Sequence, residues 1–257
     1  MRGFTLIELA VVIAIVGLLL GGLLIPLATH VDAKRVSSTQ DSLDEIKQAI
    51  YGYAVSSNPM PGAHYPQITS RLPCPDCMES TDDHCNVLPA DDIGDGEEDY
   101  LNPDGLGFTG CATYEGNVPW VSLGVGQFDS WNRNFRYRVT DDFADAVADL
   151  DCGSVRVSIG LCTQGDLDVH ESVGEGSDPI AKDRAAVILS LGEEASKTLC
   201  SQAADPSPDQ EENVDCNNSI FVSSTRVEQA GNEFDDVVIW ISPSIIKLNL
   251  LEANILP

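Results

Sequence analysis

Three groups of side chains in this chain of 257 residues have types and spacings that could do chemistry: one isolated carboxylate, one acidic run and eight cysteines. The isolated carboxylate is Glu8, in a stretch with no other charged residue from Phe4 to Ala28. A charge in an apolar segment of membrane length costs about 3 kcal/mol unless an opposite charge pairs with it. No Lys or Arg lies between Thr5 and His30, so we expect that the partner of this carboxylate is not in its own helix.

The acidic run ADDIGDGEEDY contains six carboxylates within nine residues, interrupted by two glycines. Calcium takes several oxygen ligands that converge from one tight loop, and glycine permits such a turn. The spacing does not match the EF-hand pattern, so a calcium site and a solvated acidic turn are both consistent with the sequence. The ligands of the hypothetical calcium site are Asp92, Asp95, Glu98 and Asp99.

All eight cysteines follow the apolar segment: Cys74, Cys77, Cys85, Cys111, Cys152, Cys162, Cys200 and Cys216. An even number of cysteines on one side of a membrane segment indicates an oxidising compartment and structural disulfides. The Cys74-Pro-Asp-Cys77 spacing also occurs in redox and zinc half-sites. His84 and Cys85 keep the zinc alternative open, but we favour disulfides, with the pairing left unassigned.

The composition argues against two broad classes of function. A net charge of −27 and a pI near 4.1 argue against a nucleic-acid partner, because phosphate binding requires clustered Lys and Arg. The four histidines lack the HExxH spacing, and the chain has no G-x-S-x-G elbow, P-loop or dinucleotide fingerprint. We therefore expect that the protein is not an enzyme and has no obligatory cofactor, with calcium as the one candidate.

The apolar segment Leu9–Ala28 is long enough to cross a hydrocarbon core of about 30 Å as a helix. A secretory signal peptide would have a shorter apolar core followed by a small-residue cleavage site, and LLIPLATHVDAKR offers no obvious one. We therefore expect that the segment is retained. The flanking charges slightly favour the opposite orientation, but the cysteines place the large C-terminal part outside the cytoplasm.

A second helical pattern follows directly. Apolar residues recur at helical spacing after Asp32, with charged residues between them: Val36, Leu43, Ile46, Ile50 and Tyr53. The sequence thus predicts one helix from Phe4 to about Val55, apolar all round at first and then amphipathic. Gly21, Gly22 and Pro26 mark a weak point within it. Prolines and a glycine in SSNPMPGAHYP end the helix.

The rest of the chain reads as short strands separated by turns. The predicted strands are WVSLGV, FRYRVT, VRVSIGL, AAVILSL, SIFVSS and VVIWIS. They predict an antiparallel sheet that buries the amphipathic helix stripe, which is an α+β fold. DDFADAVADL predicts a short helix, and residues 195–218 a polar loop that Cys200 and Cys216 could clamp.

The heptapeptide Gly3-Phe4-Thr5-Leu6-Ile7-Glu8-Leu9, followed by an aliphatic and then an amphipathic helix, closely resembles the N-terminus of type IV pilins and pseudopilins. The resemblance implies that a prepilin peptidase cuts between Gly3 and Phe4 and methylates Phe4. It also implies that Glu8 meets the amino terminus of a neighbouring subunit during assembly. The leader Met1–Gly3 is very short for this family, and Pro26 lies one residue beyond the usual helix proline.

The resemblance implies a pilin-like organisation. Residues 1–3 are a leader, 4–28 a transmembrane and assembly helix, 29–57 its amphipathic continuation and 58–257 a β-rich extracytoplasmic head with disulfide-stapled loops. Later segments such as RLPCPD and NVPWVSLGV resemble a subgroup of large prepilin-like proteins.

The implied function is that of a structural subunit of a type IV pilus-like filament, a helical polymer of identical or related subunits. The precursor would lie in the inner membrane and the product in an extracellular filament. The alternatives are a pseudopilin of a type II secretion system, in a periplasmic pseudopilus, and an adhesin or calcium-dependent binding module displayed by the pilin helix.

Mass spectrometry of the mature protein tests the processing prediction. We expect a chain that starts at Phe4, carries one added methyl group at its amino terminus and has lost protons to disulfide formation. An intact Met1 would contradict the predicted cleavage.

Overall fold

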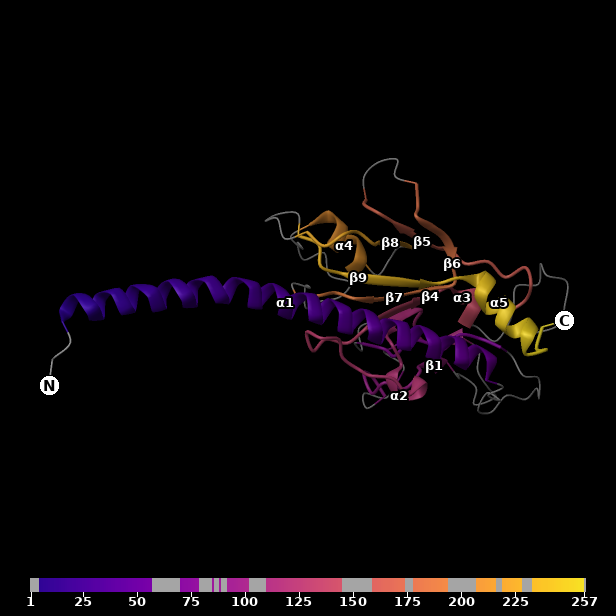
Figure 1. Cartoon of the computed structure of the whole chain (residues 1–257). Helices are drawn as coiled ribbons and strands as arrows, with labels where there is room; N and C mark the ends of the chain where they lie inside the picture. The colour runs from indigo at the N-terminus through magenta and orange to yellow at the C-terminus, as the bar shows by residue number, and fades with distance from the viewer. Residues whose placement is uncertain are drawn as a thin grey trace.

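The computed structural model of the whole chain shows one long helix leading into a head of strands and short helices (Figure 1). It describes residues 5–56, 70–78, 85, 88, 92–101, 110–144, 159–173, 178–193, 207–215, 219–227 and 233–256, without the side chains of residues 19–29. The fold is α+β, with antiparallel sheets and disulfides, as the sequence predicted.

Helix α1 spans Leu6–Val55, 50 residues, close to the bounds that the sequence predicted. Thr5 caps its start, and Ser56 caps its end by donating its backbone N–H to the carbonyl oxygens of Gly52 and Tyr53. The helix continues through Pro26, because an interior proline removes one backbone hydrogen bond without necessarily ending a helix.

The two halves of α1 have different surroundings. The first half projects beyond the head (Figure 1), and its large aliphatic side chains from Leu6 to Leu18 are exposed. In the second half the predicted stripe is confirmed, because Leu43, Ile46 and Ile50 are buried in the head.

None of the helices in the described part of the chain is both long and apolar enough to cross a membrane. The membrane span predicted for residues 4–28 stays a prediction.

The main sheet is antiparallel and has the strand order β3-β4-β7-β9. Its strands are β3 (Glu115–Asn117), β4 (Arg136–Val139), β7 (Ala186–Ser190) and β9 (Val237–Ile241). One face packs against α1 and the C-terminal helix α5 (Pro243–Glu252). The core between them includes Tyr137, Val139, Ile188 and Ile241 from the strands and Ile246 and Leu250 from α5.

A second sheet, in the order β6-β5-β8, supplies the other core. It consists of β5 (Leu167–His170), β6 (Ala181–Arg184) and β8 (Ile220–Val222), and α4 (Pro208–Val214) packs against β8. Its apolar residues cluster with Val187, Leu189 and Val238 of the main sheet. Strands β7 and β9 are therefore buried on both faces, which explains their uninterrupted apolar sequences. The sequence predicted an antiparallel sheet. The β5–β8 pair is parallel, so the second sheet is mixed.

Four smaller elements lie in the described part of the head. They are the strand pair β1 (Tyr100–Leu101) and β2 (Gly110–Cys111) and the short helices α2 (Trp120–Leu123) and α3 (Asp141–Ala144). Helix α3 confirms the start of the short helix predicted in DDFADAVADL, whose remaining residues lie outside the described part.

Two sequence predictions are wrong. WVSLGV is not a strand, because Trp120 starts the short helix α2, which ends at Gly124 in the left-handed conformation with φ 68°. Residues 195–218 do not form only a polar loop: Ser207 caps α4, which buries Gln210, Asn213 and Val214. Among the other predicted strands, β4, β7, β8 and β9 are confirmed. In VRVSIGL only residues 159–161 are described, and they form no strand.

The cysteines among the described residues are in disulfides. Cys74 bonds to Cys111 and Cys77 bonds to Cys85, while Cys162 is also in a disulfide. No cysteine in the described residues is free. The two sulfurs of the CxxC motif have different partners, so this motif is neither a redox pair nor a zinc half-site. Cys152, Cys200 and Cys216, with the predicted clamp of the last two, lie outside the described residues.

Candidate functional site

The first turn of α1 holds Glu8 in a capping box with Thr5. The Thr5 backbone N–H and hydroxyl donate to Glu8 Oε2, over 3.0 Å and 2.9 Å. In return, the Glu8 backbone N–H donates to Thr5 Oγ1 over 3.4 Å. The carboxylate thus satisfies a backbone donor at the helix start that has no partner within the helix.

The expected cationic partner of Glu8, outside its own helix, stays a prediction, because the contacts seen here are hydrogen bonds with the neutral Thr5. Thr5, in the cap of the same helix, is a neutral hydrogen-bond partner. The Thr-x-x-Glu spacing of a capping box was visible in the sequence and could have identified this contact. Gly3 and Phe4, the predicted cleavage residues, lie outside the described residues. After the predicted cleavage, the new amino terminus would be at Phe4. This is one residue before Thr5, whose backbone N–H donates to Glu8.

The aliphatic surface around Glu8 is exposed to an unusual degree. Leu6, Ile7 and Leu18 expose 89%, 73% and 78% of their surface. An apolar surface of this extent marks an interaction surface. The described first turn therefore combines one fixed carboxylate with an apolar helix exterior.

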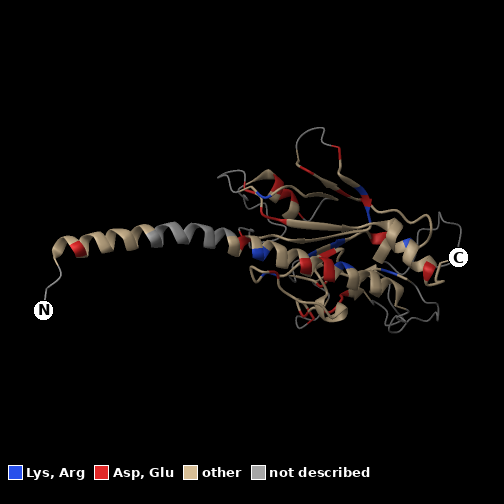
Figure 2. Cartoon of the chain, in the orientation of Figure 1, with Lys and Arg blue, Asp and Glu red and all other residues tan. Residues whose placement is uncertain are grey.

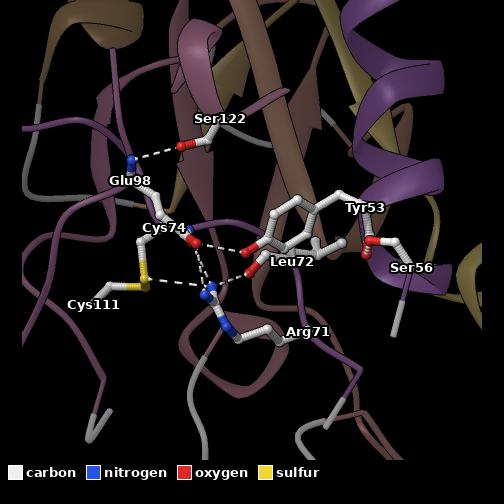
Figure 3. A network of polar contacts seen from close by, with 8 residues as sticks. All are labelled: Tyr53, Ser56, Arg71, Leu72, Cys74, Glu98, Cys111 and Ser122. Carbon is white, nitrogen blue, oxygen red and sulfur yellow. Dashed lines mark hydrogen bonds and ion pairs between the residues drawn. A yellow bond between two sulfur atoms is a disulfide. The ribbon is translucent and has the colours of Figure 1, made fainter. Parts of the chain in front are cut away.

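A second polar centre lies at the C-terminal end of α1, within the head (Figure 3). Both oxygens of Glu98 bind the Arg71 guanidinium, with Nη1–Oε2 at 2.8 Å and Nη2–Oε1 at 2.9 Å. The Tyr53 hydroxyl donates to Glu98 Oε1 over 2.6 Å, and Arg71 lies 5.5 Å from the centre of the Tyr53 ring. Burial raises the pKa of the Tyr53 phenol, so this hydroxyl stays protonated and acts as the donor.

The three residues Tyr53, Arg71 and Glu98 form a clasp that joins three parts of the chain. The backbone N–H of Cys74 donates to Glu98 Oε2 over 3.2 Å, which links the clasp to the Cys74–Cys111 disulfide. Ser122 of α2 accepts the backbone N–H of Glu98. The clasp therefore fixes the end of α1 to the disulfide and to the acidic run.

The predicted calcium ligands point to different places. Asp92 and Asp95 are exposed, and Asp95 Oδ1 accepts the backbone N–H of Glu97. Glu98 belongs to the clasp, and the buried Asp99 accepts the Cys77 N–H over 2.7 Å. The described residues contain no group of three or more His, Cys, Asp or Glu side chains that could hold a metal ion. The calcium hypothesis gains no support here and stays a prediction.

Two carboxyl groups, Asp76 and, in the acidic run, Asp99, are buried and have no salt bridge to any described residue. Asp76 accepts hydrogen bonds from the Gly94 N–H over 2.9 Å and the Asn117 amide over 3.2 Å. Burial raises the pKa of Asp76 to about 7, opposed by the Asn117 hydrogen bond and reinforced by the charge of Asp99. Burial likewise raises the pKa of Asp99 to about 6. Sequence reasoning missed Asp76, because nothing near it in the sequence indicates burial.

Comparison with known families bears on the N-terminal segment that contains Glu8. Residues 1–24 match the family model described as a prokaryotic N-terminal methylation motif. The class is therefore that of proteins with this N-terminal motif, and the resemblance to type IV pilins and pseudopilins is confirmed for the N-terminus. The match ends within α1 and does not reach the head. No curated protein and no solved structure matches the chain.

The clasp generates a stability prediction. Arg71→Met leaves the Glu98 carboxylate buried without its cation, which lowers the free energy of unfolding by about 3 kcal/mol. Tyr53→Phe removes one hydrogen bond to a charged group and lowers it by about 1.5 kcal/mol. Denaturant unfolding of the full chain in detergent, followed by tryptophan fluorescence, measures both.

The control is Arg35→Met, whose ion pair with Asp32 at 3.7 Å is between partly exposed side chains. It changes the unfolding free energy by less than about 1 kcal/mol. An equal decrease in the free energy of unfolding for the Arg35 and Arg71 variants would show that the clasp stabilises the fold no more than a surface ion pair does.

The buried acids generate a pH prediction. The pKa of Asp76 is higher in the folded chain than the usual value of 3.8, so the folded state holds a proton that the unfolded state has released. The resulting stabilisation is full below about pH 4 and is lost as the pH rises to about 7. Asp76→Asn removes this pH-dependent loss, so the melting temperature of the variant rises relative to that of the wild type between pH 4 and pH 8.

Thermal melts of the full chain at four pH values test this difference. Asp41→Asn, on the exposed surface of α1, is the matched control and should give a difference that does not change with pH in this way. A constant difference for the Asp76 variant would contradict the assigned pKa.

Proposed function

We propose that the chain is a structural subunit of a type IV pilus-like filament, assembled through α1. The observation that carries the proposal is the methylation motif at residues 1–24, with Glu8 held at the first turn of a helix whose aliphatic surface is exposed. Helices of this kind bury their apolar surface against one another when subunits polymerise.

Charge pairing supports a role for Glu8 in that step. A carboxylate between packed apolar helices is tolerated when a cation lies close to it. Cleavage after Gly3 by a prepilin peptidase creates such a cation at Phe4, on this chain or on the next. In the proposed filament, the Glu8 carboxylate of one subunit binds the methylated amino terminus of a neighbour, which sets the axial register of the subunits.

The proposal includes a path through the cell. Before assembly, α1 anchors the precursor in the inner membrane with the head outside the cytoplasm, where oxidising conditions allow the disulfides to form. Assembly then exchanges lipid contacts for contacts between helices, and the acidic head faces solvent. No enzymatic activity and no nucleic-acid partner is part of this proposal.

A pseudopilin of a type II secretion system shares this architecture and differs in the length and place of the fibre. If the protein is the bulk component of sheared extracellular filaments, it is a pilin. Its presence only in short periplasmic fibres would identify a pseudopilin.

The variant Glu8→Gln tests the proposed mechanism. Glutamine keeps the shape and still accepts the Thr5 N–H, so the capping box and membrane insertion persist while the charge is lost. Removing one partner of a buried ion pair costs about 3 kcal/mol, so filament yield falls more than about tenfold. Quantification of sheared filaments against total protein gives the readout.

The matched control is Glu45→Gln, an exposed position on the amphipathic half of the same helix, which should assemble normally. Wild-type yield from Glu8→Gln would remove the charge-pairing role.

A further inference from the structure

Helix α5 is apolar on two opposite sides. Ile246 and Leu250 point into the core and expose 1% and 0% of their surface. Ile245, Leu248 and Leu251 expose 44%, 53% and 41%, and these three residues define the outer face of α5. At 100° per residue they lie on the side of the helix away from the two buried residues.

The exposed Ser244 and Glu252 flank this outer face, so α5 is not apolar all round, but its three aliphatic side chains still form an apolar patch on the surface. The lysine of α5 does not shield its outer face, because Lys247 Nζ donates to the carbonyl oxygens of Leu161 and Thr163 over 2.8 Å and 2.6 Å. These bonds hold its charge against the neighbouring loop of the head. The three aliphatic residues of the outer face are therefore available for contact with a partner.

The charge of the protein limits what that partner can be if it is another copy. The chain carries a net charge of −27, and acidic residues occur on most parts of the head (Figure 2). Two copies repel each other wherever acidic surfaces meet. Contact between copies is therefore favoured at surfaces that are apolar and close to neutral.

The exposed half of α1 is such a surface. From Leu6 to Leu18 it exposes nine large aliphatic side chains, and Glu8 is its one charged residue. In a single chain it cannot reach α5, because the projecting helix and α5 lie at opposite ends of the molecule (Figure 1). Between copies, the two surfaces can meet.

We propose that the outer face of α5 is covered in the assembled filament by the aliphatic half of α1, residues 6–18, of a second copy. This inference rests on the proposed filament function and adds a contact between head and helix to the contacts among helices. Because the two surfaces differ and lie at opposite ends, the contact is heterologous and propagates into an open polymer.

Site-specific photo-crosslinking tests the contact in cells that produce the full chain. A benzophenone amino acid replaces Leu248 on α5, Ile13 on α1 or Ile180, an exposed apolar residue outside both surfaces. The expected product at Leu248 is a dimer whose crosslink, mapped by mass spectrometry, falls within residues 6–18 of the second copy. The Ile180 position should give no such product.

The outcomes separate the inference from the proposed function. Crosslinks between copies at Ile13 but none at Leu248 would overturn the contact and leave the filament in place, as would a Leu248 crosslink to another segment or another protein. Loss of crosslinks between copies at both positions would overturn the proposed function as well.

A charge substitution supplies a second readout. Leu248→Glu adds a negative charge to the outer face of α5 and should lower filament yield at least about fivefold, while Ile180→Glu should not. Both variants should melt like the wild type before assembly, because both side chains are exposed. Unchanged yield from the Leu248 variant would contradict the proposed contact.

Discussion

The Glu98 carboxylate, bound by Arg71 and Tyr53, is the polar interaction that fixes the last turn of α1 to the head, whose core also buries the apolar stripe of the helix. Its partners come from segments that are 27 and 45 residues away in sequence. A buried charge needs all of its partners at once, so the end of α1, the Cys74–Cys111 disulfide and the acidic run take one relative position. The last turn of α1 therefore has one position relative to the head.

The sequence predicted those features that depend on local periodicity. The extent of α1, its buried stripe and the strands β4, β7, β8 and β9 follow from spacing and from continuous apolar runs. The short helix at Trp120 escaped prediction because the turn depends on contacts with a distant segment: the backbone N–H of Val121 donates to the carbonyl oxygen of Gly96, and the Trp120 ring packs where a side chain at Gly96 would stand. Helix α4 was missed although Ser207 and Pro208 form a usual helix start.

The candidate sites likewise divide into one that a local sequence motif predicts and others that depend on tertiary contacts. The Thr5–Glu8 capping box is local, and its motif is readable from four residues. Glu98, by contrast, looks like any other carboxylate of its acidic run, and only the tertiary fold separates it from the exposed Asp95. The burial of Asp76 depends on its pairing with Asn117, 41 residues away, which no local pattern encodes.

The capping box also bears on how reversible the proposed assembly would be. In the free subunit Glu8 already has hydrogen bonds, so a new partner replaces existing contacts and the net gain is smaller than that of an unsatisfied charge. Its side chain is held in one conformation beforehand, so little rotational entropy remains to be lost. Such an exchange selects one alignment of neighbours without a deep energy minimum, and a polymer built on it can release its subunits intact.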